Sequence, residues 1–253
     1  MDPTIEWTKD DEFVLDGITY DSRSLPTPGL RSSDDRFFIM KPRWQIERYE
    51  QLFKQDAPKN IFELGIWDGG STAFIAQLAR PRKLVAVDLK PVPCAALANF
   101  IQKQGLSSSV VPYYGVDQAD QQRLSEIVDR DFRGEALDLV VDDASHQVIP
   151  TRASFNVLFP LVKPGGTYLI EDWSWAHNVA IPENAKEWTP LTLFILELMF
   201  VCAHHPTVIE EIVLKKGSAF VRRGPANLDP KAFDVATSYG KAGQKMMSDL
   251  TRG

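Results

Sequence analysis

The chain has little cysteine, no long apolar run and no excess of positive charge. Its two cysteines, Cys94 and Cys202, are too few for a disulfide framework or a cysteine-based zinc site, and they suit a reducing cytoplasm. The most apolar run, Leu191 to Ala203, is interrupted by Thr192 and Glu197 and falls short of the roughly 18 residues that span a bilayer. The acidic N-terminal residues lack the basic and apolar segments of a signal peptide. We therefore expect a soluble cytoplasmic protein with no membrane partner.

The charge balance is acidic, and the composition is otherwise that of an ordinary globular protein. In 253 residues, 28 lysines and arginines stand against 34 aspartates and glutamates, which gives a net charge of -6. A protein that binds nucleic-acid phosphates over a large surface needs an excess of positive charge, so we expect no nucleic-acid partner. With 44% hydrophobic residues, the chain can bury a sizeable core as one large α/β domain or two small ones.

The first forty or so residues contain no long periodic segment, and we expect residues 1–55 to form an N-terminal cap with a lead-in helix. Pro26, Pro28 and Gly29 interrupt them, which predicts an irregular N-terminal cap that leads into a helix over about residues 42–53. The apolar patch Phe37–Met40 in this cap has three open interpretations. It can be a lid over a ligand, a contact between copies of the chain, or ordinary core.

From residue 60 onward, apolar strands alternate with helices. The expected strands are 60–64, 83–88, 110–115, 137–142 and 167–172, followed by a hairpin of 207–214 and 218–223. The expected helices are 71–78 with Ser71 as N-cap, 94–104, 121–128, a helix of which 154–161 is a part, and 191–203. This alternation is typical of a parallel sheet covered on both faces. The sequence predicts an α/β fold with a doubly wound, mostly parallel seven-stranded sheet and an antiparallel C-terminal hairpin. We expect this domain to span residues 56–224, with a tail, 225–253, packed on or near it.

Doubly wound sheets bind ligands beyond the carboxyl ends of their strands, so the residues that end each strand matter most. The first strand runs from Glu63 into a glycine-rich loop that ends at Ser71. Glycines let this backbone turn tightly and approach a ligand, although the spacing differs from a dinucleotide fingerprint. Asp88 ends the second strand, where a carboxylate can accept the hydroxyls of a ribose. The alternatives are a plain strand-to-helix turn and a capping aspartate.

These residues resemble the motifs of class I S-adenosylmethionine-dependent methyltransferases. Glu63-x-Gly65-x-x-x-Gly69 is similar to their first motif, with Trp67 where many members have glycine. Asp88 matches their ribose-binding acid, Asp117-Gln118 the loop near the adenine, and KPGGTYLIED the turn and strand that follow. The resemblance implies a Rossmann-like fold with S-adenosyl-L-methionine as cofactor. The residues it implies for cofactor binding are Glu63, Gly65, Trp67, Gly69, Ser71, Asp88, Asp117, Gln118 and Asp142.

A second cluster, of acidic residues, ends two later strands. Asp142-Asp143 and Glu171-Asp172 would repel one another in a partly buried cleft, and a divalent cation would relieve that repulsion. Oxygen ligands favour Mg²⁺ or another divalent cation over zinc. His146 lies three residues beyond Asp143 and can accept a hydroxyl proton near neutral pH. The alternatives are solvated strand-end acids and a structural histidine.

This cluster resembles the sites of metal-dependent O-methyltransferases. Catechol-type enzymes carry a lysine base where this chain has His146, and the Asp-x-x-His plus Glu-Asp pattern is closer to macrolide-sugar and rhamnosyl O-methyltransferases, which are related to the cephalosporin-hydroxylase-like group. The resemblance implies that Asp143, Glu171 and Asp172 hold Mg²⁺ and that His146, beside Asp143, is the general base. It implies a sugar or glycoside hydroxyl as the acceptor, and it is compatible with a homo-oligomer.

The acceptor itself is left open. Trp173, Trp175 and His177 follow the acidic pair and can either line an acceptor pocket or pack on the core. The alternative activities are a catechol-type or other phenolic small-molecule O-methyltransferase and a non-catalytic cofactor-binding protein.

Overall fold

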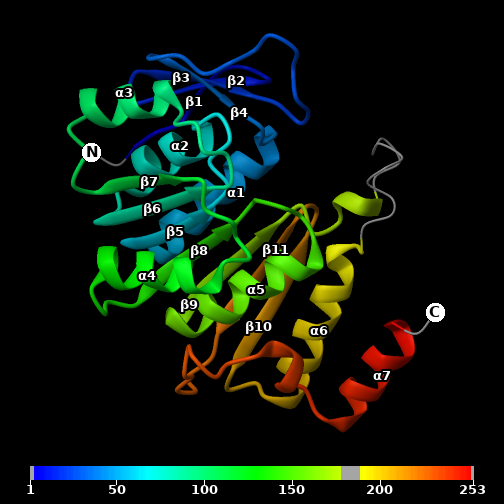
Figure 1. Ribbon diagram of the computed structural model, residues 1–253. Coiled ribbons are helices and arrows are strands. Elements are labelled where there is room, and N and C mark those ends of the chain that lie inside the picture. Colours follow the sequence, from blue (N-terminus) through cyan, green and yellow to red (C-terminus); the bar gives the residue numbers. More distant parts are fainter. Residues whose placement is uncertain (1–2, 178–188, 252–253) are drawn as a thin grey trace. The chain divides into compact units, whose positions relative to one another are not determined.

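A computed structural model describes residues 3–177 and 189–251 (Figure 1). The chain divides into two compact units, Met1–Val116 and Asp117–Gly253. Its strands form a four-stranded sheet, β1-β2-β3-β4, and a seven-stranded sheet with the order β10-β11-β9-β8-β5-β6-β7. The predicted α/β class with a mostly parallel seven-stranded sheet is confirmed.

The first unit begins with a small sheet that the sequence analysis missed. Its strands are β1 (Glu6–Lys9), β2 (Glu12–Leu15), β3 (Ile18–Ser22) and β4 (Arg36–Ile39). The first three pair antiparallel and β4 joins β3 in parallel. The expectation of an irregular cap is therefore wrong. Strands of four or five residues are too short to show a clear alternation, and the turn at Asp16-Gly17, where both residues have positive φ, gives only a local signal.

The rest of the first unit follows the predicted alternation. Its elements are α1 (Arg43–Asp56), β5 (Asn60–Leu64), α2 (Gly70–Ala79), β6 (Lys83–Asp88), α3 (Ala95–Lys103) and β7 (Val110–Tyr114). The strands β5, β6 and β7 run parallel. Their carboxyl ends therefore lie at one edge of the sheet, where the glycine-rich loop and Asp88 are found.

Aromatic side chains join the small sheet to helix α2. The ring of Phe74 on α2 lies 5.8 Å from that of Phe13 and 6.0 Å from that of Tyr20. The buried Tyr20 hydroxyl also donates a 2.6 Å hydrogen bond to Gln77. Phe37 is fully buried against Tyr20, so the patch that begins there belongs mainly to the core, although Met40 is 39% exposed.

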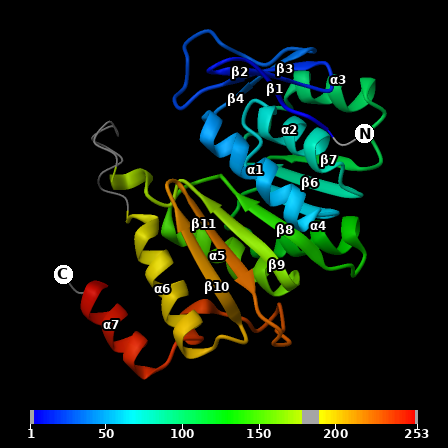
Figure 2. The ribbon, with the colours of Figure 1, turned by 180° about the vertical axis from the view of Figure 1, so that it is seen from behind.

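The second unit continues the sheet pattern and ends in helices. Its helices and strands are α4 (Gln121–Phe132), β8 (Leu137–Asp142), α5 (Val148–Leu158), β9 (Val162–Glu171), α6 (Leu191–His204), β10 (Ile209–Lys215), β11 (Ser218–Arg223) and α7 (Lys241–Thr251), with 3-10 turns at Phe159–Leu161, Trp175–His177 and Val235–Thr237. Strands β8 and β9 are parallel, whereas β9, β11 and β10 pair antiparallel. Helix α7 lies beside α6 in both views (Figures 1 and 2).

Two boundaries in the second unit differ from the prediction. Helix α5 ends at Leu158, and residues 159–161, which are predicted to continue it, form a 3-10 turn. Strand β9 begins at Val162 and includes the Pro164-Gly165-Gly166 segment, which was expected to precede it. The register between β8 and β9 shifts at this segment, so these residues form an irregularity within the strand rather than a separate turn.

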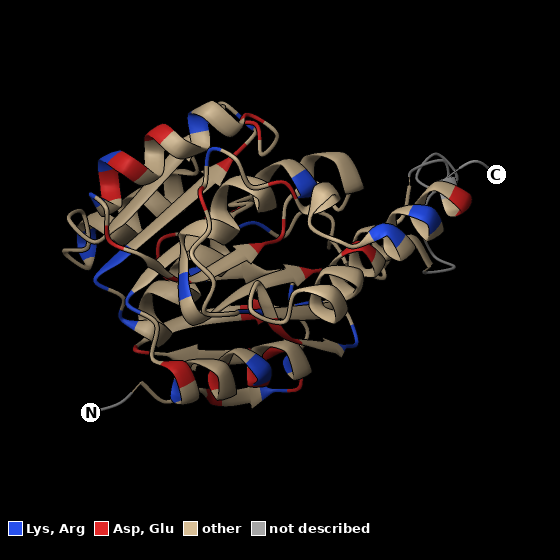
Figure 3. Ribbon diagram, turned by 90° about the horizontal axis from the view of Figure 1, so that it is seen from below, with Lys and Arg blue, Asp and Glu red and all other residues tan. Residues whose placement is uncertain are grey.

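The charges are mixed, and the helices are short. Figure 3 shows acidic and basic residues interspersed along the ribbons of both units. Among residues 3–177 and 189–251, none of the helices combines the length and apolarity that crossing a bilayer requires.

Candidate active site

In the first unit, Asp88 fastens the glycine-rich loop between β5 and α2. Its Oδ2 accepts hydrogen bonds from the backbone N–H groups of Ile66 at 2.9 Å and Trp67 at 2.7 Å, and its Oδ1 accepts one from Lys90 at 2.8 Å. Trp67 has a positive φ of 48°, a conformation that glycine adopts without strain. The Asp88 carboxylate thus holds the tryptophan at a turn where glycine would be the easier residue.

Helix α2 starts one residue earlier than predicted, and Ser71 is not its N-cap. The N-cap is Gly69, with a φ of 81° and no side chain to cap the helix. At Gly70 an added Cβ would lie 2.1 Å from the carbonyl oxygen of Phe38. Because β4 passes so close to the helix entry, the chain needs glycine here, and this contact could not be seen in the local sequence.

Glu63 is buried inside the first unit. It is fully buried in β5, and its Oε2 accepts a 2.6 Å hydrogen bond from the Thr72 hydroxyl in the first turn of α2. No motif in the sequence marks Thr72 as a partner of Glu63. The acid that opens the glycine-rich motif therefore connects strand β5 to the start of the helix.

In the second unit, Asp142 lies at the end of β8 within a buried polar network. Its carboxylate accepts hydrogen bonds from Gln118, Ser154 and Tyr168 at 2.9 to 3.2 Å. Burial raises the pKa of Asp142 to about 6, and these hydrogen bonds oppose that rise only in part. Asp117, the neighbour of Gln118, is exposed, and its carboxylate accepts a hydrogen bond from the Ala119 N–H.

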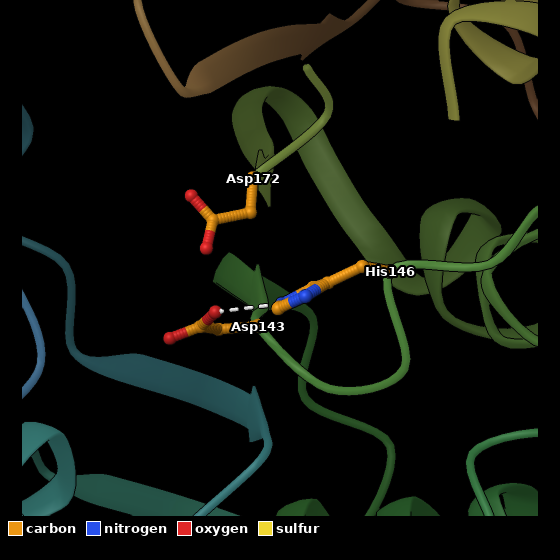
Figure 4. A group of neighbouring side chains, drawn as sticks. All are labelled: Asp143, His146 and Asp172. Carbon is orange, nitrogen blue, oxygen red and sulfur yellow. Dashed lines mark hydrogen bonds and ion pairs between the residues drawn. The ribbon is translucent and has the colours of Figure 1, made fainter. Parts of the chain in front are cut away.

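Three residues predicted for metal chemistry come together beyond β8 and β9. Asp143, His146 and Asp172 each offer a ligand atom, and these atoms lie within 4.8 Å of one another (Figure 4). Asp143 follows β8 and Asp172 follows β9, so the parallel pairing of these strands sets their side chains at one edge. Two carboxylates and one imidazole form a donor set that suits a divalent cation.

Glu171 lies outside this group of ligand atoms. It is the last residue of β9, is only 1% exposed, and pairs with Ser218 of β11. Neighbouring residues on a strand point to opposite faces, and Asp172 leaves the strand through a positive φ of 52°. The two adjacent acids therefore have different surroundings.

His146 is half-buried, as are Asp143 and Asp172, and its imidazole ring can exchange a proton. Its Nε2 lies 3.1 Å from Oδ1 of Asp143. Burial disfavours the charged ring, but the hydrogen bond and charge of Asp143, with the charges of Asp172 and Asp142, outweigh burial and raise the pKa of His146. The residue has a φ of 56°, an uncommon conformation outside glycine.

The three ring-bearing residues after β9, Trp173, Trp175 and His177, have different surroundings. The Trp175 ring lies 5.9 Å from the His146 ring, measured between centroids. Trp173 donates from its indole N–H to the Lys215 carbonyl at the β10–β11 turn, and His177 bonds to the Thr192 hydroxyl of α6. Of the three residues predicted to contact an acceptor, Trp175 is the one whose ring contacts His146.

Ser145, Ser154 and Tyr168 are site residues that the sequence analysis missed. Ser154 and Tyr168 bond to Asp142, and the Ser145 N–H donates to Gln118. Tyr168 lies within an apolar strand and is separated from Asp142 by 26 positions, so no local pattern connects them. The KPGGTYLIED motif contains this tyrosine but gives no sign that it faces Asp142.

The part of the chain from β5 to the segment after β9 is similar to a known family. A model described as a methyltransferase domain matches residues 62–173. Residues 62–173 are therefore similar to methyltransferase domains. The match runs from Phe62 in β5 through Trp173 and thus includes the glycine-rich loop, Asp88 and the group Asp143–His146–Asp172.

Two curated relatives of the chain are O-methyltransferases. The chain is 36% identical over 157 residues to mycinamicin VI 2''-O-methyltransferase of Micromonospora griseorubida, and 29% identical over 157 residues to demethylmacrocin O-methyltransferase of Streptomyces fradiae. Each match covers 57% of this chain and 36% of the relative. The chain thus matches about a third of the length of these proteins.

Solved structures agree on the fold. The MycE methyltransferase in complex with Mg, SAH and mycinamycin VI is 23% identical with a TM-score of 0.53, covering 70% of this chain and 49% of that one. The SAH-bound Podospora anserina methyltransferase PaMTH1 is 18% identical with a TM-score of 0.55, covering 73% and 80%. At these identities the likeness establishes a class I methyltransferase fold.

Proposed function

We propose that this protein is a Mg²⁺-dependent O-methyltransferase that transfers the methyl group of S-adenosylmethionine to a hydroxyl of a sugar or glycoside. The observation that carries the proposal is the group Asp143–His146–Asp172, which lies beyond two parallel strands of a methyltransferase domain. Support for the acceptor comes from the curated relatives, one of which is a mycinamicin VI 2''-O-methyltransferase. MycE, solved with Mg, SAH and mycinamycin VI, supports the metal.

The proposal gives the residues of this group separate roles. Asp143 and Asp172 would hold the cation, with Glu171 as a third carboxylate, and a cation held there would supply the charge that lowers the pKa of the acceptor hydroxyl and orients it. His146 would accept the hydroxyl proton as the oxygen bonds to the methyl carbon, and the carbon–sulfur bond of the cofactor would break to leave S-adenosylhomocysteine. Positive charge beside Asp143 and Asp172 would offset the attraction that raises the pKa of His146, which would favour the neutral ring that a general base requires.

The cofactor residues of the proposal are considered unit by unit. In the first unit the proposal assigns Glu63, Gly65, Trp67, Gly69, Ser71 and Asp88. In the second unit it assigns Asp117, Gln118 and Asp142. Asp117 is exposed and can contact the cofactor directly. Gln118 and Asp142 are nearly fully buried, so they act through the residues that they hold.

Calorimetric titration tests the proposal. EDTA-treated protein should bind S-adenosylmethionine and Mg²⁺, and Asp143→Asn should lose Mg²⁺ binding while it keeps cofactor binding. Asp138→Asn is a matched control, because Asp138 is an acid of β8 that pairs with Lys163 at 2.6 Å and lies outside the group. Cofactor binding without metal binding in the unmodified protein contradicts the metal-assisted mechanism. Methylation of a catechol but not of a glycoside contradicts the acceptor class, and cofactor binding without turnover of either supports a non-catalytic protein.

A further inference from the structure

The buried network behind the metal-binding group contains a side chain that reaches the loop carrying His146. Gln118, Asp142, Ser154 and Tyr168 are all at most 5% exposed and all belong to the second unit. The Gln118 amide nitrogen donates to Asp142 Oδ1 at 2.9 Å and to the Ser154 hydroxyl at 3.1 Å. Both hydrogens of the amide group are used by these two contacts.

The other end of the same amide holds the loop. The Gln118 Oε1 accepts a 3.0 Å hydrogen bond from the backbone N–H of Ser145. Ser145 lies between Asp143 and His146, and its hydroxyl accepts a hydrogen bond from the N–H of Gln147. One planar group thus links the fixed end of β8 to the backbone between the two residues of the site.

We propose that Gln118 is a positioning residue that fixes the loop 143–147, so that Asp143 and His146 keep the geometry needed for metal binding and proton transfer. This inference rests on the proposed function and deepens it. Partners that orient metal ligands from behind commonly alter metal affinity or activity by about 10–100-fold when they are replaced.

The position requires the chemistry of an amide. A carboxylate would accept from Ser145 but would face Asp142 with a second negative charge. A methionine of similar length would lose both ends of the link, leaving the Ser145 N–H and the Asp142 carboxylate each without one partner. The structure therefore predicts that Gln118→Met releases the loop even where the fold persists.

Asn156 on α5 provides a matched control. Its amide nitrogen donates to Asp234 at 3.0 Å and its carbonyl oxygen accepts from the N–H of Val235 at 3.0 Å. Gln118 also donates from its amide nitrogen to an aspartate and accepts a backbone N–H at its carbonyl oxygen. The contacts of Asn156, however, hold the C-terminal segment and not the loop 143–147. Asn156→Leu should therefore lose stability without changing the loop 143–147.

The experiment compares Gln118→Met with Asn156→Leu in the full chain. Mn²⁺ affinity is measured by the electron paramagnetic resonance signal of the free ion, and S-adenosylmethionine affinity by calorimetry. Gln118→Met should weaken Mn²⁺ binding about 10–100-fold and lower kcat, whatever its effect on cofactor affinity. Asn156→Leu should keep all three values. Unchanged Mn²⁺ affinity in Gln118→Met, or loss confined to cofactor affinity, overturns the proposal.

Amide hydrogen exchange separates this proposal from the function on which it rests. In Gln118→Met the Ser145 amide should exchange faster than in the unmodified protein, and in Asn156→Leu it should not. If the unmodified protein binds no Mn²⁺, the proposed function fails, and the exchange rate still decides whether Gln118 holds the loop. Equal exchange of Ser145 in both variants overturns the positioning role.

Discussion

His146 differs from the other histidines of the chain in the groups around its ring. Asp143 lies at hydrogen-bond distance, Asp172 belongs to the same group, and the ring of Trp175 is adjacent. His205, by contrast, is an exposed residue at the carboxyl end of α6. A histidine between two carboxylates can bind and release a proton in a site where a hydroxyl must lose one.

At the residue scale, His146→Ala should lower kcat by about 10²–10⁴-fold, the usual contribution of a general base. Binding of S-adenosylmethionine, measured by calorimetry, should persist because the predicted cofactor residues are untouched. His205→Gln should retain full turnover. Activity of His146→Ala close to that of the unmodified protein would exclude His146 as the base.

A second prediction at this scale concerns Glu12 in the N-terminal sheet. Hydrogen bonds from Thr8, Arg36 and Lys9 lower the pKa of Glu12 to about 2. A carboxylate with a depressed pKa stabilises the fold above its unfolded pKa, near 4.3, and loses that contribution as the pH falls toward 2.

Arg36→Met should therefore reduce stability at pH 7 and flatten the loss of stability between about pH 4.5 and 2. Arg36 also bonds to Asp21 at 2.6 Å, so the loss at neutral pH includes that contact. The measurement is the thermal midpoint across this pH range, with Arg43→Met as control because Arg43 pairs with the exposed Glu47 on α1. A pH profile parallel to that of the unmodified protein would contradict this assignment.

At the scale of elements, the entry of α2 is held by its contact with β4. Gly70 stands where the backbone of Phe38 leaves no room for a side chain. Thr72, two residues later, bonds to the buried Glu63 of β5. Three elements thus determine where the helix begins, and with it the shape of the glycine-rich loop.

Gly70→Ala should destabilise the protein by about 1–3 kcal/mol or more, as overpacking of a fitted site does. Gly105→Ala is the control, since Gly105 has open space around it and a φ of 68°. That variant should lose about 1–2 kcal/mol through backbone strain alone. Denaturant unfolding measures both. Equal or smaller loss in Gly70→Ala would show that β4 can move away from the helix.

At the scale of the whole molecule, the segment that is similar to methyltransferase domains contains residues of each unit. Residues 62–173 include the last part of the first unit and the beginning of the second. The C-terminal segment packs on the second unit through Asn156–Asp234 and the Phe200–Tyr239 ring pair. A ligand that binds the folded state but not the unfolded chain stabilises the folded state.

Mg²⁺ should raise the thermal midpoint of EDTA-treated protein, by an amount that corresponds to about 2.7 kcal/mol at a hundredfold excess over Kd. Asp172→Asn should abolish this shift. Ca²⁺ and Mg²⁺ can be compared to find the preferred ion. A midpoint that does not respond to any divalent cation would contradict a metal site at Asp143–His146–Asp172.

The sequence by itself determined the alternation of strands and helices from residue 60 onward. It also showed that acidic residues and a histidine follow the strands, because apolar runs and strand-end acids are local features. It did not determine the N-terminal sheet, whose strands are too short to show their period.

Only the tertiary structure decided which acids meet. Asp172 joins Asp143 and His146, whereas Glu171, one residue earlier, does not. Asp142 and Gln118 face inward to Tyr168 and Ser154. Side-chain direction at a strand end depends on the register of neighbouring strands and on a single backbone φ, and contacts between residues distant in sequence fix both.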